Sequence, residues 1–254
     1  MFFPFADTPN PPGYSPVTRG LILLNIAVFV LFTLPLSMSA PDLSDPRLAE
    51  YLKSIGVNSP AQLRQILGHL TAYQPFIYEF GYRPAEPSLL TLFTSMFLHG
   101  GLLHLGGNML FLWIFGDNVE YRLGSARFLL AYLGCGVLAT LFFSVFAPGS
   151  NIPLVGASGA ISGVLGAYFI WFPYNRVKTF VFLFPILMDF IYLPARLVLG
   201  FYILIDNLLP FLFASSGAGG IAHGAHIGGF IGGIALALWK SPRRHASYRP
   251  PSSF

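Results

Sequence analysis

The sequence LVGASGAISGVLGAYFIW, Leu154–Trp171, places serine hydroxyls inside an apolar segment made mostly of small and aliphatic residues. Ser158 is flanked by Gly156, Ala157 and Gly159, which leave its surroundings almost free of side chains. Small residues of this kind allow neighbouring membrane helices to pack closely. They would equally allow a second chemical group to approach a serine nucleophile. The rest of the sequence decides between packing and chemistry.

The composition indicates an integral membrane protein. The chain has 254 residues, of which 54% are hydrophobic and 9% charged, whereas soluble domains contain about 25% charged residues. The apolar residues form blocks of membrane-spanning length. The net charge of +4 is dispersed along the chain, which suits contacts with a lipid bilayer and indicates no nucleic-acid partner. Cys135 is the single cysteine, so no disulfide forms within the chain.

We predict an all-α polytopic membrane protein with six transmembrane helices. The predicted spans are 20–37, 98–117, 125–147, 155–173, 193–213 and 222–239. A long segment, 38–88, separates the first two spans and contains two short surface helices, RLAEYLKSIGV and SPAQLRQILGHL, the second capped by Ser59 and Pro60. The stretch before the fifth span, within 180–194, is apolar but broken by prolines. We interpret it as an interfacial or re-entrant connection, with a seventh span as the alternative.

The distribution of basic residues predicts that both termini are cytoplasmic. Six spans place the termini on one side, and that side collects most of the Lys and Arg residues, whereas the short loops 148–154 and 214–221 have none. Positive charge in short loops marks the cytoplasmic face. The chain then divides into a Pro-rich leader, 1–18, a membrane domain, 19–240, with 38–88 as its external loop, and a basic tail, 241–254.

Polar residues gather near the outer ends of the second, fourth and sixth spans. They are His99, His104, Asn108, Ser158, His223 and His226. By helical rise, Ser158 lies about 27 Å, His226 about 21 Å and Asn108 about 18 Å above the cytoplasmic boundary. In a hydrocarbon core about 30 Å thick, all three fall in the outer half. Such residues can act as hydrogen-bonding glue between helices, but their common level favours a functional site.

Ser158 and His226 form a candidate catalytic pair. A serine hydroxyl needs a base to take its proton, and histidine is the natural base near neutral pH. Gly229 and Gly233 share the helical face of His226 and, with Gly159, would let the two helices approach. No Asp or Glu lies at this depth in the three polar spans, so a dyad is expected. Asp206, in the fifth span, has no assigned role.

The motifs together resemble the rhomboid family of intramembrane serine proteases. They are GASG around Ser158, HxxxN from His104 to Asn108, AHxxGxxxG from Ala225 to Gly233, and ExRxG from Glu120 to Gly124. The resemblance covers about residues 90–240. It implies that Ser158 is the nucleophile, that His226 is the general base, and that His104, Asn108 and the Ser158 amide form the oxyanion hole. Gly156, Gly159, Gly229 and Gly233 are the supporting residues.

The resemblance also implies that 38–88 lies partly in the outer leaflet beside the site. Some rhomboids carry tyrosine four residues after the nucleophile, beneath the histidine. Ser162 occupies that position here. We therefore expect a smaller floor to the site and identify no residue that orients the His226 ring.

The expected function is endopeptidase cleavage of transmembrane segments near the outer membrane face, without metal or cofactor. The expected partners are membrane-protein substrates and the lipid bilayer, in the inner membrane of a bacterial cell. Nothing in the sequence indicates an oligomeric state. One alternative is a non-catalytic rhomboid relative that acts in binding or quality control. Another is a transporter, because a polar layer can line a proton or solute path.

Overall fold

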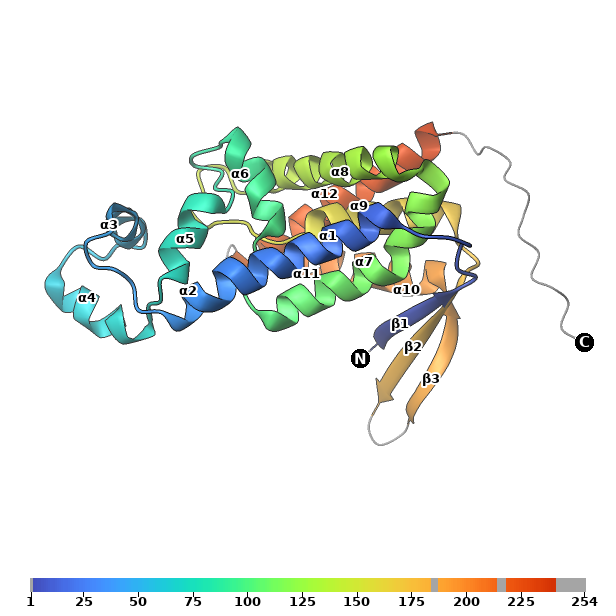
Figure 1. The fold of residues 1–254 in the computed structure, drawn as a ribbon, viewed down its shortest axis with the longest axis horizontal. Helices are drawn as coiled ribbons and strands as arrows, with labels where there is room; N and C mark the ends of the chain where they lie inside the picture. Colours follow the sequence, from blue (N-terminus) through green and yellow to red (C-terminus); the bar gives the residue numbers. More distant parts are fainter. Residues whose placement is uncertain (1, 184–186, 214–217, 241–254) are drawn as a thin grey trace, which may run out of the picture.

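The computed structural model describes residues 2–183, 187–213 and 218–240, which form a helical bundle with a small sheet near one end (Figure 1). A helix lies in each of the six segments predicted to span the membrane. These helices are α1 Pro16–Val28, continued by a π-helical turn Phe29–Thr33 and by α2 Leu34–Met38; α7 Leu102–Leu123; α8 Ser125–Phe146; α9 Ser158–Trp171; α10 Ala195–Ile203, continued by a π-helical turn Leu204–Leu208 and by α11 Leu209–Phe213; and α12 Ala218–Trp239. The predicted tail, 241–254, lies outside the described residues.

Within the described residues, three continuous helices are long and apolar enough to cross a membrane: Pro16–Met38, Ser125–Phe146 and Ala195–Phe213. A fourth candidate is bent by 89°, because Leu89–Phe97 meets α7 at an angle. Length and composition thus support a polytopic membrane protein.

Helix α9 is shorter than its predicted span. Its 14 residues correspond to about 21 Å of helical rise. The predicted depth of Ser158, about 27 Å, was too large because it counted Phe172–Arg176 as helix. The chain leaves the helical conformation at Phe172, whose φ and ψ are −128° and 46°. Ser158, the first residue of α9, is therefore expected to be recessed below the outer surface.

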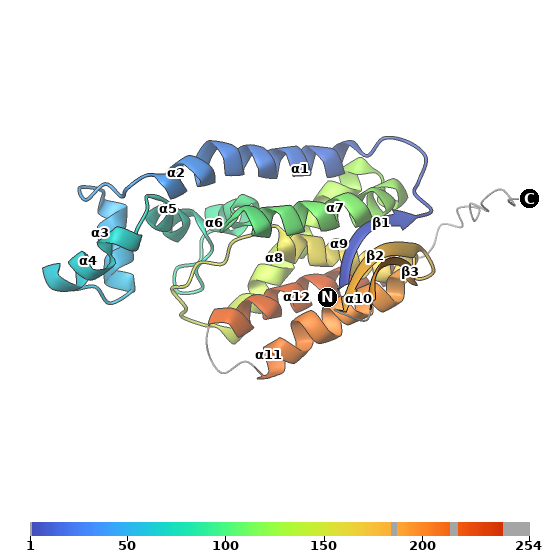
Figure 2. The ribbon, with the colours of Figure 1, turned by 90° about the horizontal axis from the view of Figure 1, so that it is seen from below.

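Helix α9 lies at the centre of the bundle and contacts α7, α8, α10 and α12. Figure 2 shows it between α7 and α12. Every residue from Ala160 to Tyr168 is buried, as expected for a helix that is apolar all round. The stretch quoted first from the sequence thus becomes the helix around which the others pack.

Glycines bring the backbones of α9 and α12 into direct contact. A Cβ atom on Gly229 would lie 2.0 Å from the carbonyl oxygen of Gly159, and one on Gly233 would lie 1.8 Å from that of Gly163. No side chain fits at either α12 position unless the helices separate. On α9 the contact is made differently from the prediction, because the Cα atoms of Gly159 and Gly163 face α8, while their carbonyl groups face α12.

We expect Gly233→Ala to lower the thermal unfolding temperature in detergent and to slow any reaction that needs α9 and α12 together. Overpacking a tight contact costs about 1–3 kcal/mol, and here the clash is with backbone. Gly134→Ala in α8 is the matched control, because a Cβ there meets nothing within 4 Å. An unchanged unfolding temperature for Gly233→Ala would contradict the contact.

A three-stranded antiparallel sheet corrects the all-α prediction. Its strands are β1 Phe2–Thr8, β2 Arg176–Leu183 and β3 Leu187–Pro194, in the order β1-β2-β3. The segment before the fifth span, predicted as an interfacial or re-entrant connection, therefore forms two paired antiparallel strands, and the alternative of a seventh span is wrong. The physical reason is the period-2 burial of β2, in which Val177, Thr179 and Val181 are buried and the residues between them are more exposed.

The predicted leader, 1–18, contributes β1 to this sheet, and α1 begins inside its range, at Pro16. Asp7 anchors the strand to the bundle. Its carboxylate accepts hydrogen bonds from the Tyr168 hydroxyl of α9 and from Asn118 Nδ2 of α7, the latter at 2.8 Å. Burial raises the pKa of Asp7 to about 7. Ionisation of this group therefore opposes docking of β1 increasingly as the pH rises toward 7.

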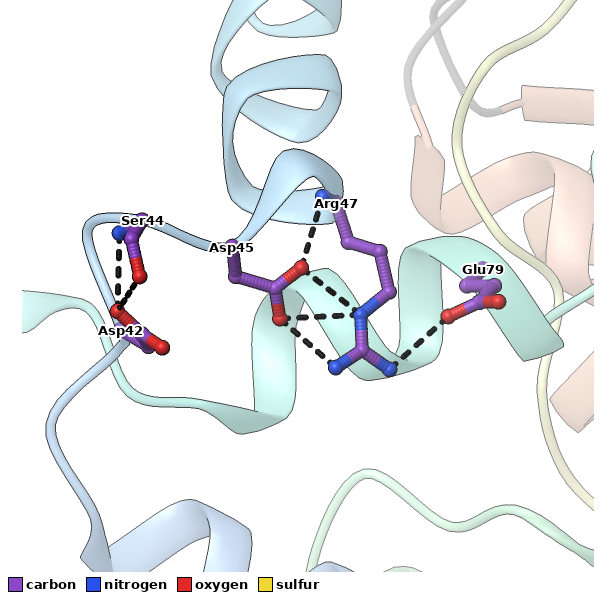
Figure 3. Close-up of polar contacts among 5 residues, drawn as sticks. All are labelled: Asp42, Ser44, Asp45, Arg47 and Glu79. Carbon is purple, nitrogen blue, oxygen red and sulfur yellow. Dashed lines mark hydrogen bonds and ion pairs between the residues drawn. The ribbon is translucent and has the colours of Figure 1, made fainter.

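The long segment between the first two spans contains the helices α3 Pro46–Ser54, α4 Pro60–Ile66, α5 Tyr73–Phe80 and α6 Leu89–Thr94, with 3₁₀ turns at Leu67–His69 and Ser95–Phe97. The two predicted surface helices are confirmed, and Ser59 forms a capping box with Gln62 at the start of α4. Figure 3 shows Asp45 capping α3 and pairing with Arg47, which also reaches Glu79 on α5. These contacts join α3 to α5.

The C-terminal part of this segment is hydrogen-bonded to the loop before α9. Tyr82 and Leu154 exchange two backbone hydrogen bonds, of 3.0 and 2.8 Å, and the Gly156 amide donates to the Ser95 carbonyl at 2.8 Å. The external segment therefore positions the residues that lead directly into Ser158.

Glu120, from the ExRxG motif, joins three helices at the other end of the bundle. It is buried in the last turn of α7. Its carboxylate accepts hydrogen bonds from the Val17 and Thr18 amides, the Thr18 hydroxyl and the Ser125 hydroxyl. This anion satisfies two amides of the first turn of α1 that have no partner within their own helix, and it accepts from a side chain at the start of α8.

Candidate active site

Ser158 is the first residue of α9 and follows a glycine in an unusual conformation. Gly156 has φ +122°, which residues with a Cβ rarely adopt. A Cβ there would also lie 2.8 Å from the His104 ring. The turn at Gly156 therefore places the Ser158 side chain at a helix N-terminus, where backbone amides lack partners and negative charge is stabilised.

The His226 ring contacts the Ser158 hydroxyl. His226 Nε2 lies 2.7 Å from Ser158 Oγ, and both residues are half-buried. The two side chains come from α12 and α9, the helices joined by the glycine contact. The structure thus brings together the two residues that the sequence paired, and their catalytic roles stay a prediction.

The other ring nitrogen of His226 contacts Asn207, which the sequence reasoning missed. His226 Nδ1 lies 2.6 Å from Asn207 Oδ1, and His223 Nδ1 lies 3.3 Å from the same oxygen. An amide oxygen can only accept, so Nδ1 of His226 carries the hydrogen and Nε2 presents its lone pair to Ser158. The only sequence signal for Asn207 was an amide beside Asp206 in an apolar span.

Tyr202 from α10 corrects the prediction of a smaller site floor. Its hydroxyl lies 2.7 Å from Ser162 Oγ, and its ring centroid lies 6.4 Å from that of His226, with the rings tilted by 31°. Ser162 is fully buried. An aromatic ring therefore does lie beside His226, but it comes from the fifth apolar segment and not from the position four residues after Ser158.

His104 directs a donor toward Ser158. The Gly100 amide donates to His104 Nδ1 at 3.4 Å, so Nε2 carries the hydrogen. A Cβ on Gly156 would lie 2.8 Å from His104 Nε2 and 3.6 Å from Ser158 Oγ. The protonated ring nitrogen therefore faces the same small space as the serine hydroxyl.

Asn108 lies one turn further along α7 and is buried. Within the described residues, its Nδ2 has no hydrogen-bond acceptor. Buried polar atoms are rarely left unpaired, and such an atom requires an explanation. A donor held ready for a charge that forms during a reaction is one such explanation.

The remaining polar residues lie around this centre. His99 is fully buried, and its ring packs at 5.1 Å against that of His104. Asp206 is exposed in a groove of ≈ 250 Å³ between α7 and α10, which Tyr202 also lines. In the described part of the chain, no three His, Cys, Asp or Glu side chains gather as a metal site would require.

A family model described as the Rhomboid domain matches residues 86–243, more than half of the chain. The chain belongs to the rhomboid family. With its apolar helices, this rhomboid is an integral multi-pass membrane protein. The family predicted from the GASG, HxxxN and AHxxGxxxG motifs is thereby confirmed.

Similar proteins include bacterial and mitochondrial rhomboids. Rhomboid protease GluP of Bacillus subtilis is 41% identical over 146 residues, covering 58% of this chain and 25% of the relative. Rhomboid protein 1, mitochondrial, of Saccharomyces cerevisiae is 35% identical over 102 residues, 39% of this chain and 30% of the relative. The human presenilin-associated rhomboid-like protein, mitochondrial, is 32% identical over 164 residues, which cover 61% of this chain and 39% of the relative. This rhomboid spans two fifths or less of the length of these relatives.

Proposed function

We propose that this rhomboid is a serine endopeptidase that cleaves peptide bonds within the membrane. The observation that carries the proposal is the 2.7 Å contact between Ser158 Oγ and His226 Nε2. It joins a nucleophile to a base within hydrogen-bond reach. The similarity to a relative named as a rhomboid protease supports the same conclusion.

The reaction proceeds in two halves. His226 Nε2 takes the proton of the Ser158 hydroxyl as Oγ attacks the scissile carbonyl carbon, whose π electrons move to the oxygen. Collapse of the tetrahedral intermediate breaks the C–N bond, and the imidazolium gives its proton to the leaving amine. In the second half, His226 Nε2 takes a proton from water as the water oxygen attacks the acyl carbon. The second intermediate collapses with cleavage of the C–Oγ bond, and the imidazolium returns the proton to Ser158 Oγ as the acid leaves.

The oxyanion is stabilised by donors already in place. His104 Nε2–H faces the space beside Ser158, and Asn108 Nδ2 is a buried donor on the same helix. The amide of Ser158, at the N-terminus of α9, is the third donor. Donors fixed before the reaction need no rearrangement as charge develops, which lowers the barrier.

The proposed substrates are membrane proteins cut near the outer end of a transmembrane segment. The recessed N-terminus of α9 supports this depth, and the segment must unwind locally because a helix conceals its peptide bonds. Six spans with cytoplasmic termini, and a place in the bacterial inner membrane, complete the proposal. The absence of charge from loops 148–154 and 214–221 supports the orientation.

Labelling with a fluorophosphonate tests the assignment. We expect purified wild-type protein in detergent to form a covalent adduct at Ser158, located by mass spectrometry, because His226 activates this hydroxyl. Ser158→Ala should form none. A wild-type protein that is folded by size exclusion and thermal unfolding, yet unlabelled, would favour the non-catalytic binding or quality-control relative. Solute flux in liposomes that survives Ser158→Ala would favour the transporter.

A further inference from the structure

Asn207 touches the imidazole of His226 on the side opposite Ser158. The Nδ1–Oδ1 distance is 2.6 Å, slightly shorter than the 2.7 Å between Nε2 and Ser158 Oγ. The three side chains therefore form a continuous chain of hydrogen bonds. It crosses from α12 to the fifth apolar segment at one end and to α9 at the other.

The orientation of the Asn207 amide is fixed by a second hydrogen bond. Its Nδ2 donates to the Tyr202 carbonyl at 2.8 Å, and the residue is 2% exposed. With Nδ2 engaged, Oδ1 must face the histidine. Because Oδ1 cannot donate, it selects the His226 tautomer with hydrogen on Nδ1 and a lone pair on Nε2. That tautomer is the one able to accept the Ser158 proton.

The local backbone explains why an asparagine can reach this place. Asn207 lies in the π-helical turn Leu204–Leu208, between α10 and α11. A π turn inserts an extra residue into a helix and changes the directions of the side chains, and such turns are frequent at functional sites. The Tyr202 carbonyl that holds the amide lies five residues earlier, in the turn before.

His223 contacts the same oxygen more weakly. Its Nδ1 lies 3.3 Å from Asn207 Oδ1, against 2.6 Å for His226. The shorter contact assigns the oxygen chiefly to His226. His223 thus adds a second, longer contact to the amide oxygen, and its ring meets that of His226 edge to face at 6.2 Å.

We infer that Asn207 is a positioning residue that makes the site a Ser158–His226–Asn207 triad instead of a dyad. The inference rests on the proposed protease function. Asn207 touches neither substrate nor the reacting atoms, but it holds the imidazole in one tautomer and one orientation. It would also stabilise the imidazolium formed in the transition state, through a neutral acceptor. Tyr202 supports both partners, by its carbonyl to Asn207 and by its ring beside His226.

The test compares Asn207→Leu with Asn207→Asp. Leucine has a similar shape but no hydrogen bonds, whereas aspartate keeps an acceptor for His226, loses the donor to Tyr202 and adds a negative charge beside the imidazole. We expect Asn207→Leu to lower kcat and the fluorophosphonate labelling rate by about 10- to 100-fold with little change in KM, the range typical of losing the partner that orients a metal-bound histidine. Asn207→Asp should recover most of both rates.

Asn25→Leu is the matched control. Asn25 is also a fully buried asparagine within a span, and its Nδ2 also donates to a backbone carbonyl, that of Leu21, at 2.7 Å. The Asn25→Leu variant should keep kcat near the wild-type value. This control separates loss of a buried amide from loss of the contact with histidine. Size exclusion and thermal unfolding establish that each variant is folded. If Asn207→Leu fails to fold, Asn207→Ala replaces it.

Two results would overturn the triad. One is a wild-type kcat for folded Asn207→Leu or Asn207→Ala. The other is an equal loss for Asn207→Asp and Asn207→Leu, which would show that acceptance from His226 is not what matters. Wild-type protein that neither cleaves nor labels would instead refute the proposed function, and the triad with it.

Discussion

Ser158→Ala is expected to lower kcat for cleavage of a transmembrane reporter substrate by about 10⁶-fold, which a gel assay records as complete loss. The hydroxyl is the only nucleophile that His226 Nε2 contacts among the described residues. His226→Ala should reduce cleavage about equally, because the hydroxyl is inert without its base. The measurement is turnover of a single-span reporter protein by purified variants in detergent.

The double variant gives a sharper result than either single one. Residues that act as one unit are non-additive, so Ser158→Ala with His226→Ala should be no slower than Ser158→Ala alone. Ser144→Ala is the control, because Ser144 is a half-buried serine of α8 that contacts Tyr82 instead of a histidine. Cleavage by Ser158→Ala at the wild-type rate would assign the chemistry to another group.

The predictable part of the site was the part governed by helix geometry. A constant helical rise placed His226 and Asn108 at similar depths, because α12 and α7 are continuous helices of 22 residues. For Ser158 the same rise gave too large a depth, because α9 ends at Trp171. The glycines at 229 and 233 then indicated which helices would touch. Depth and small-residue spacing are properties of one helix at a time, and a sequence displays them directly.

Asn207 and Tyr202 could not be found in this way. Both belong to the fifth apolar segment, where the π turn at Leu204–Leu208 shifts the directions of the side chains relative to a regular helix. Nothing in the sequence fixes that shift. The prediction of a smaller site floor at Ser162 was wrong for a related reason. The Ser162 hydroxyl contacts a tyrosine from another helix. Only tertiary packing reveals that contact.

The sheet was missed because some of its outward-facing residues are also apolar. Strand β2 alternates buried Val177, Thr179 and Val181 with Lys178 and Phe180. An aromatic residue on the open face conceals the alternation that normally identifies a strand. The pairing of β2 with β1 joins residues far apart in sequence, which local patterns do not predict.

Asn108→Ala is expected to lower kcat by about 10²–10³-fold while KM changes little. Loss of one oxyanion-hole donor has this effect because the negative charge exists only in the transition state. Steady-state kinetics with the same reporter measures the split between kcat and KM. An effect on KM alone would instead place Asn108 in binding of the ground-state substrate.

The Asn108→Ala variant should lose activity but keep its stability. Asn108 Nδ2 has no acceptor within the described residues, so removing it sacrifices no hydrogen bond of that donor and the unfolding temperature should scarcely fall. Asn118→Ala, on the same helix, is the matched control. Its Nδ2 donates to buried Asp7 at 2.8 Å, and leaving that carboxylate short of a donor costs about 1–3 kcal/mol. Asn118→Ala should therefore lower the unfolding temperature while kcat stays near wild type. If Asn108→Ala instead loses stability and activity together, its amide serves packing and the oxyanion hole is reduced to His104 and the Ser158 amide.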